Sequence, residues 1–145
     1  MAEGDRIVEL KLDKSSARLL HGLRARAEHA QPAMAIVSEM LVTRVDDEWD
    51  SAGHGRWKDL AASTKRKRRG NSAQILKDTG RAAASVHGEA TSDTAEAYTD
   101  VAYMVFHASD AARTVIPYRN PFDLADPEDV AEEAARIILD WISSK

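Results

Sequence analysis

The sequence predicts a single helix-dominated α+β domain over residues 1–145, with long N-terminal helices, a small antiparallel sheet and a C-terminal helix. Three observations lead to this prediction. The length is typical of one domain that can bury its own core. Three segments repeat apolar side chains at the three- and four-residue steps of amphipathic helices. Shorter segments show the alternation, or the β-branched and aromatic enrichment, that is typical of strands.

The N-terminal segment is expected to contain a short strand and then a helix. Residues 6–12 alternate apolar and charged side chains, which indicates a half-buried strand. Asp13 or Ser15 can cap the following helix, because a short polar side chain there accepts a hydrogen bond from a free backbone N–H. This helix is expected to end near His29. Four apolar side chains lie on one face of this helix: Leu19, Leu20, Leu23 and Ala27.

A second helix is expected from Pro32, since proline is tolerated in the first helical turn. Its apolar side chains recur at helical spacing, and they are Met34, Val37, Met40, Leu41, Val45 and Trp49. Residues 50–58 contain two glycines and no periodicity, which indicates a loop. We expect an exposed basic loop over about residues 50–74, interrupted by a short helical turn at 59–64.

The second half of the chain is expected to supply the rest of the sheet and the last helix. Residues 81–87 favour a short helix that can pass into a strand, and 95–101 favour a strand followed by a helix over 102–108. Asp126 before Pro127 is a strong helix start, with a capping side chain and a proline in the first turn. The expected buried face of the final helix consists of Val130, Ala134, Ile137, Ile138 and Trp141.

The composition excludes several classes of protein. The chain has no cysteine, so disulfide bonds and thiolate chemistry are excluded. No apolar run approaches the ~20 residues that a membrane-spanning helix needs. The first ten residues lack the basic-then-apolar layout of a secretion signal, which predicts synthesis in the cytoplasm.

Charge is distributed unevenly along the chain. The net charge of −4 argues against a molecule that binds nucleic acid through its overall charge. Five of the twenty basic residues nevertheless form one run, and they are Lys65, Arg66, Lys67, Arg68 and Arg69. Acidic residues concentrate at 46–50 and 123–133. Such a pattern suits a subunit that meets differently charged neighbours on different faces.

The basic run has two interpretations. Five adjacent cations can contact phosphates and release counterions, which gives salt-sensitive binding to DNA of any sequence. No aromatic residue lies within the run, so stacking on bases is not supported. We favour docking against an acidic protein surface and keep a small DNA-binding protein that uses residues 65–69 as the alternative.

No residue pattern points to catalysis or to a bound cofactor. The five histidines lack metal-site spacing, and no P-loop, nucleophile elbow or dinucleotide fingerprint is present. Gly53-His54-Gly55 has neither the third glycine nor the preceding strand of a nucleotide site, so a loop is the simpler interpretation. We therefore expect no enzyme activity, no metal and no cofactor.

Between about residues 30 and 125 the chain carries seven short elements in a characteristic order. They are Trp57-Lys58-Asp59-Leu60, Thr64-Lys65, Ile75-Leu76, Thr79-Gly80, Ser85-Val86, Tyr103 through His107, and Ile116-Pro117-Tyr118-Arg119-Asn120-Pro121-Phe122. In this order the chain resembles the phage virion morphogenesis, or tail completion, family. It is also similar to the related head-to-tail joining minor tail proteins of long-tailed phages.

The resemblance implies a structural subunit of a tailed phage particle, at the neck or the tail end, that works through protein–protein contacts. It implies a homo-oligomer in the form of a ring, located in the virion, whose other partners are phage neck and tail proteins. Nonspecific contact with DNA is compatible with such a position, and no membrane contact is expected.

The matched residues divide into packing and interface candidates. For Trp57, Leu76 and Phe122 we favour packing within the chain, because large apolar side chains of this kind anchor loops to a core. Arg119 follows Pro117 in a stretch that proline stiffens, which lowers the cost of ordering it on a partner. Its guanidinium can form a forked ion pair. We therefore expect Arg119 and the basic run to lie at interfaces.

Overall fold

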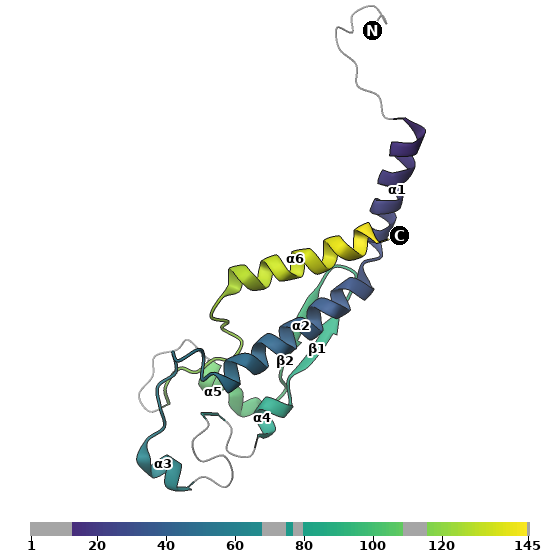
Figure 1. The fold of residues 1–145 in the computed structure, drawn as a ribbon. Helices are drawn as coiled ribbons and strands as arrows, with labels where there is room; N and C mark the ends of the chain where they lie inside the picture. The colour runs from purple at the N-terminus through teal and green to yellow at the C-terminus, as the bar shows by residue number, and fades with distance from the viewer. Residues whose placement is uncertain (1–12, 68–74, 77–79, 109–115, 145) are drawn as a thin grey trace, which may run out of the picture.

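The computed structural model describes residues 13–67, 75–76, 80–108 and 116–144, and the fold in Figure 1 is a helix-dominated α+β domain. Helices account for 60% of the described residues, so the predicted fold class is confirmed. The elements are α1 Lys14–Glu28, α2 Gln31–Asp50, α3 Ala62–Lys67, α4 Arg81–Ala84, β1 His87–Ala90, β2 Ala95–Tyr98, the 3-10 helix η2 Ala102–Met104, α5 Val105–Ala108 and α6 Pro127–Ser143.

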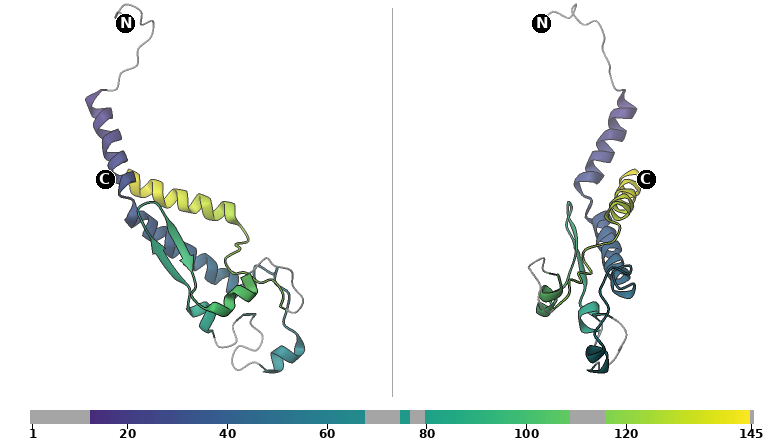
Figure 2. Two further views of the ribbon diagram at one scale, coloured as in Figure 1. Left: turned by 180° about the vertical axis from the view of Figure 1, so that it is seen from behind. Right: turned by 90° about the vertical axis from the view of Figure 1, so that its left-hand side faces the viewer.

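The long helix α2 is the centre of the fold. It packs against both strands and against α6, and Figure 2 shows it between the hairpin and α6. The strands are antiparallel, with Ala90 opposite Ala95 next to the turn. At Gly88 the strand lies so close to α2 that an added Cβ would be 3.1 Å from Ser38 Oγ. Glycine therefore allows the hairpin to approach the helix.

The helix starts follow the predicted local signals. Asp13 Oδ1 accepts a 2.7 Å hydrogen bond from Ser16 N at the start of α1. Asp126 Oδ1 accepts from Asp129 N at 3.1 Å at the start of α6, where Pro127 occupies the first turn. These bonds satisfy backbone donors that the helix itself leaves free. The hydrogen bond to Ser16 N also lowers the pKa of Asp13 below its usual 3.8.

The hydrophobic core lies at the C-terminal end of α2. Its buried members come from five separate segments and are Val45, Trp49, Trp57, Leu60, Ile75, Ala82, Val101 and Met104. Val37, Val45 and Trp49 on the predicted apolar face of α2 are buried, whereas Met34, Met40 and Leu41 are half-buried. The core therefore collects long-range contacts at one end of the molecule.

The apolar face of the first helix is largely exposed. None of the α1 residues, all of which the structure describes, is buried, and Leu19 and Leu20 are 62% and 50% exposed. The reason is that α1 projects beyond the body in Figure 1 and contacts the C-terminal part of α6, where Arg26 Nε donates to Ile142 O at 2.5 Å. The predicted strand at residues 6–12 lies outside the described residues.

The expected buried face of α6 is only partly covered. Val130 is buried, but Ala134, Ile137, Ile138 and Trp141 are half-buried. Arg44 on α2 forms ion pairs with Asp129, at 2.7 Å, and with Glu133. These pairs fix α6 along α2. Over the described residues, no helix combines the length and the apolar character needed to cross a membrane.

Candidate functional site

The residues of the sequence pattern converge at the end of the molecule where the core lies. Trp57 and Leu60 are buried there, and Leu76 and Phe122 are half-buried against them. Trp49 Nε1 also donates a long 3.4 Å hydrogen bond to Leu76 O. We call this end of the molecule, residues 45–67, 75–76, 80–86 and 101–125 as far as they are described, the distal lobe. The predicted packing roles of Trp57, Leu76 and Phe122 match these positions.

A left-handed turn after α2 returns Trp57 to the core. Four consecutive residues have positive φ angles: Ala52 at 52°, Gly53 at 66°, His54 at 55° and Gly55 at 80°. A Cβ at Gly53 would lie only 2.4 Å from Trp57 Nε1. Two features therefore favour glycine at position 53, its backbone angle and the indole that lies against it. The segment is a loop, as predicted, and its conformation is fixed by the positive φ angles and by the contact with the Trp57 indole.

A buried carboxylate joins this turn to the segment that precedes α6. The Glu48 side chain is 2% exposed, and its Oε1 accepts a 2.7 Å hydrogen bond from Ala125 N. Its Oε2 accepts from Arg56 Nη2 at 3.0 Å, and His54 Nδ1 lies 3.1 Å from Oε1. Arg56 Nη2 also donates to Asp123 O at 2.6 Å. A buried charge is tolerated here because it has an opposite charge and backbone donors.

The role of Glu48 was not predicted from the sequence, where it is one of the acidic residues 46–50. One signal was present. Glu48 follows Val45 by three residues and therefore lies on the face of α2 that Val45 and Trp49 bury. A charged residue on an apolar helix face indicates a buried ion pair, although it does not identify the partner.

Arg119 is an intramolecular anchor, which corrects its expected position at an interface. Its side chain is buried, at 6% exposure. Nε and Nη2 donate to Lys58 O at 2.9 and 2.6 Å, and Nη2 also donates to Asp59 O at 3.1 Å. The forked guanidinium thus holds two carbonyls of the loop that carries Trp57 and Leu60. The expected contact was a forked ion pair with another subunit, whereas the contacts observed are hydrogen bonds to backbone carbonyls of the same chain.

The basic run begins in a short helix and not in an open loop. Lys65, Arg66 and Lys67 form the last turn of α3, where cations are favourable next to the helix carbonyls. Lys65 Nζ donates to Asp59 Oδ2 at 2.9 Å, and this bond lowers the pKa of Asp59. Arg66 and Lys67 are exposed. Arg68, Arg69 and the predicted motif residue Thr79 lie outside the described residues.

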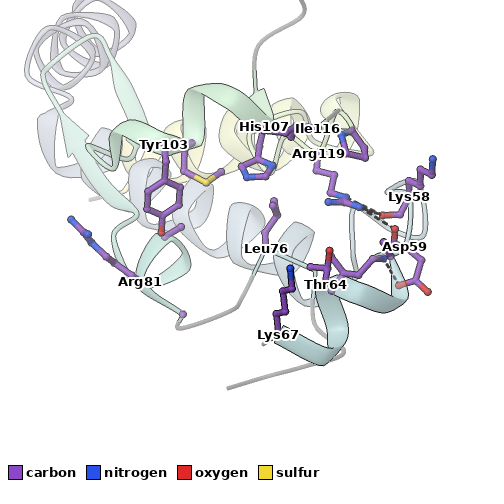
Figure 3. A pocket seen from close by; sticks show the side chains of 16 residues that line it. Lys58, Asp59, Thr64, Lys67, Leu76, Arg81, Tyr103, His107, Ile116 and Arg119 are labelled. Carbon is purple, nitrogen blue, oxygen red and sulfur yellow. Dashed lines mark hydrogen bonds between the residues drawn. The ribbon is translucent and has the colours of Figure 1, made fainter. Parts of the chain in front are cut away.

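A hollow of about 1050 Å³ separates α3 from α4 and α5 (Figure 3). Figure 3 shows Tyr103 and His107 on one side of it and Thr64 and Lys67 on the other. Gly80, which has a φ of 79° and immediately precedes α4, also lines the hollow. Other matched residues on its walls include Leu60, Leu76, Pro117 and Arg119.

The walls of the hollow combine apolar and cationic side chains. Met104, Ile116 and Tyr103 contribute apolar surface, and Lys67 and Arg81 contribute positive charge. In the part of the chain that the structure describes, no group of three or more His, Asp or Glu side chains is placed to hold a metal ion. The arrangement can accommodate an acidic or mixed protein segment.

The chain was compared with models of protein families, with curated proteins and with solved structures, and none of them matches it.

Proposed function

We propose that the chain is a structural subunit of a tailed phage particle, at the neck or the tail end, that joins neighbouring subunits through protein contacts and not through catalysis. The observation that carries the proposal is the leucine face of α1, which the described residues leave uncovered. An amphipathic helix without cover in its own chain gains free energy when another chain covers it. A joining subunit that acts in several copies needs such a surface.

The position of the sequence pattern supports the same proposal. Its buried residues maintain the shape of the distal lobe: Trp57 and Leu60 fill the core, and Arg119 holds the loop between Trp57 and Leu60. This distribution is expected when related proteins share a shape and a set of contacts. A shared reaction would instead require polar side chains that converge on one reacting centre.

The two ends of the molecule differ in chemistry, as a joining protein requires. Figure 1 shows α1 at one end and α3 at the other. The α1 end offers leucines, whereas the distal lobe offers exposed Arg66 and Lys67 beside a hollow with apolar and cationic walls. Two different surfaces allow one subunit to contact copies of itself and also a different neighbour.

The test uses the virus or induced prophage whose genome encodes the chain. Purified particles should contain the chain in several copies, measured by quantitative peptide mass spectrometry. Deletion of the gene should leave unjoined heads and tails or incomplete tails in electron micrographs, and expression of the chain from a plasmid should restore complete particles. Absence of the chain from particles that assemble normally without it would contradict the proposal.

The alternative is a small DNA-binding protein that uses residues 65–69, and exposed Arg66 and Lys67 favour it. The pair between Lys65 and Asp59 partly neutralises the run, so we expect only weak binding to duplex DNA at physiological salt. Fluorescence anisotropy between 50 and 200 mM salt separates the two functions. Micromolar or tighter binding that falls steeply with salt, and that Arg66→Gln/Lys67→Gln abolishes, would favour the alternative.

A further inference from the structure

The leucine face of α1 extends beyond the contact that α1 makes with its own chain. Leu19 and Leu20 are exposed by half or more, and Ala27 on the same face is also exposed. Leu23 and Arg26 are half-buried, and Arg26 marks the side of the helix next to α6, where it contacts Ile142 O. Together with half-buried Leu23, the exposed residues form an apolar strip along one face of the helix, larger than one isolated surface leucine.

A second uncovered strip lies on the outer face of α6, away from α2. Glu128, Glu132, Ala135 and Leu139 follow one another at four-, three- and four-residue steps, so they share one face of the helix. All four are exposed, and Leu139 is 60% exposed. This strip is acidic toward its N-terminal end and apolar toward its C-terminal end.

The two helices carry opposite charge. Helix α1 has four basic side chains and one acidic side chain, a net charge of +3 with neutral histidine. Helix α6 has five acidic side chains and one basic side chain, a net charge of −4. Arg44 engages Asp129 and Glu133, which leaves Glu128, Glu132 and Asp140 as exposed acidic groups. Opposite charge around two apolar strips favours their association and opposes pairing of like helices.

We propose that the occupant of the α1 leucine face is a second copy of this chain, and that α1 of one copy docks on the outer face of α6 of the next. The inference deepens the proposed function, because it names the partner and the surface. A symmetric pair of α1 helices is disfavoured, since it would bring two helices of charge +3 together. Contact between two different surfaces is heterologous, so repetition produces a closed ring or an open filament.

The absence of cysteine makes a direct test possible. Leu20→Cys and Leu139→Cys are introduced into two chains of different mass, which are mixed and oxidised in their full-length form. We expect a disulfide-linked dimer in the mixture, at least tenfold more abundant than in either variant alone. The matched control pairs Leu20→Cys with Ser92→Cys, an exposed position in the hairpin turn, and should give little product. Self-linking of Leu20→Cys, or equal linking in the control, would overturn the inference.

A charge reversal on α6 tests the same contact without cross-linking. Glu132→Lys should weaken self-association about tenfold in sedimentation equilibrium, whereas Glu39→Lys, at an exposed position of α2, should leave it unchanged. Equal effects of the two variants, or a chain that stays monomeric at every concentration, would count against α1–α6 docking.

The outcomes also separate the inference from the proposed function. A chain found in phage particles without Leu20–Leu139 cross-linking would refute the docking mode and leave the function standing. Specific cross-linking by a chain that is absent from particles would do the reverse.

Discussion

Near the two ends of α2, apolar helix faces have opposite fates: one is buried in the core and the other is exposed. At the C-terminal end, Val45 and Trp49 are buried among side chains from distant segments. Beyond the N-terminal end, Leu19 and Leu20 of α1 also lie on the apolar face of a helix but remain exposed. Periodicity therefore identifies the apolar face of a helix but not the chain that covers it. The distal lobe is stabilised from within, whereas α1 offers its apolar surface to a partner.

The largest expected effect is truncation of a tryptophan in the distal lobe. Trp49→Ala removes a side chain that is 1% exposed and leaves a cavity, so unfolding free energy should fall by about 3–5 kcal/mol. Leu20→Ala should change the stability of the monomer by less than about 0.5 kcal/mol, because an exposed side chain is removed. Urea unfolding at low protein concentration measures both. Comparable losses in the two variants would remove the contrast between the ends of the molecule.

The local signals made much of the fold predictable. Asp13 and Asp126 bind backbone N–H groups only three residues away, so their capping roles can be inferred from short segments. The helix at 102–108 and the strand beginning at Ala95 were likewise predicted from composition, although the strand ends at Tyr98.

The roles of Glu48 and Arg119 depend on the complete fold and could not be predicted in the same way. Glu48 accepts a hydrogen bond from a residue 77 positions later, and Arg119 donates to one 61 positions earlier. Charged residues are far more often exposed than buried, so the sequence alone predicts that Glu48 and Arg119 lie at the surface. Only the turn at 52–55 and the packing of the segment before α6 bring these groups to their partners.

The buried carboxylate gives the next largest effect. Glu48→Gln keeps the size of the side chain but removes the charge that Arg56 and Ala125 N contact, so we expect a loss of about 1.5–3 kcal/mol. Glu39→Gln, at an exposed position of α2, is the matched control and should change stability by less than about 0.5 kcal/mol. Thermal unfolding measures both variants. An unchanged melting temperature for Glu48→Gln would mean that this buried pair does not contribute net stability.

Substitutions at Gly53 and Gly55 separate the cost of a positive φ from the cost of a steric contact with Trp57. Gly55→Ala places a Cβ in open space at a φ of 80° and should cost about 1 kcal/mol, from backbone strain alone. Gly53→Ala adds a Cβ that meets the Trp57 indole, so its cost should be larger, about 2–3 kcal/mol. Tryptophan fluorescence should shift for Gly53→Ala and not for Gly55→Ala. Equal costs would show that Trp57 moves aside without loss.

The smallest effect concerns Asp59, at the entry to α3. The hydrogen bond from Lys65 and that from Leu60 N hold the pKa of Asp59 below 3.8. Because the folded-state pKa lies below the unfolded one, the stabilising contribution is present above pH 3.8. It is lost as pH falls through the lowered folded-state pKa. The group is exposed, so salt screens the pair and the effect on stability is small.

Carboxyl NMR titration measures this pKa directly. Lys65→Gln should return the pKa of Asp59 part of the way toward 3.8, since the hydrogen bond from Leu60 N remains. Arg66→Gln is the matched control and should leave the pKa of Asp59 nearly unchanged. Among the described residues of the basic run, Lys65 is the one that contacts Asp59. If the two variants shift the pKa of Asp59 equally, the cations of α3 act on Asp59 together through their charge and not through one specific hydrogen bond. The whole run would then be available to a partner at the distal lobe, as the uncovered leucines are at the opposite end.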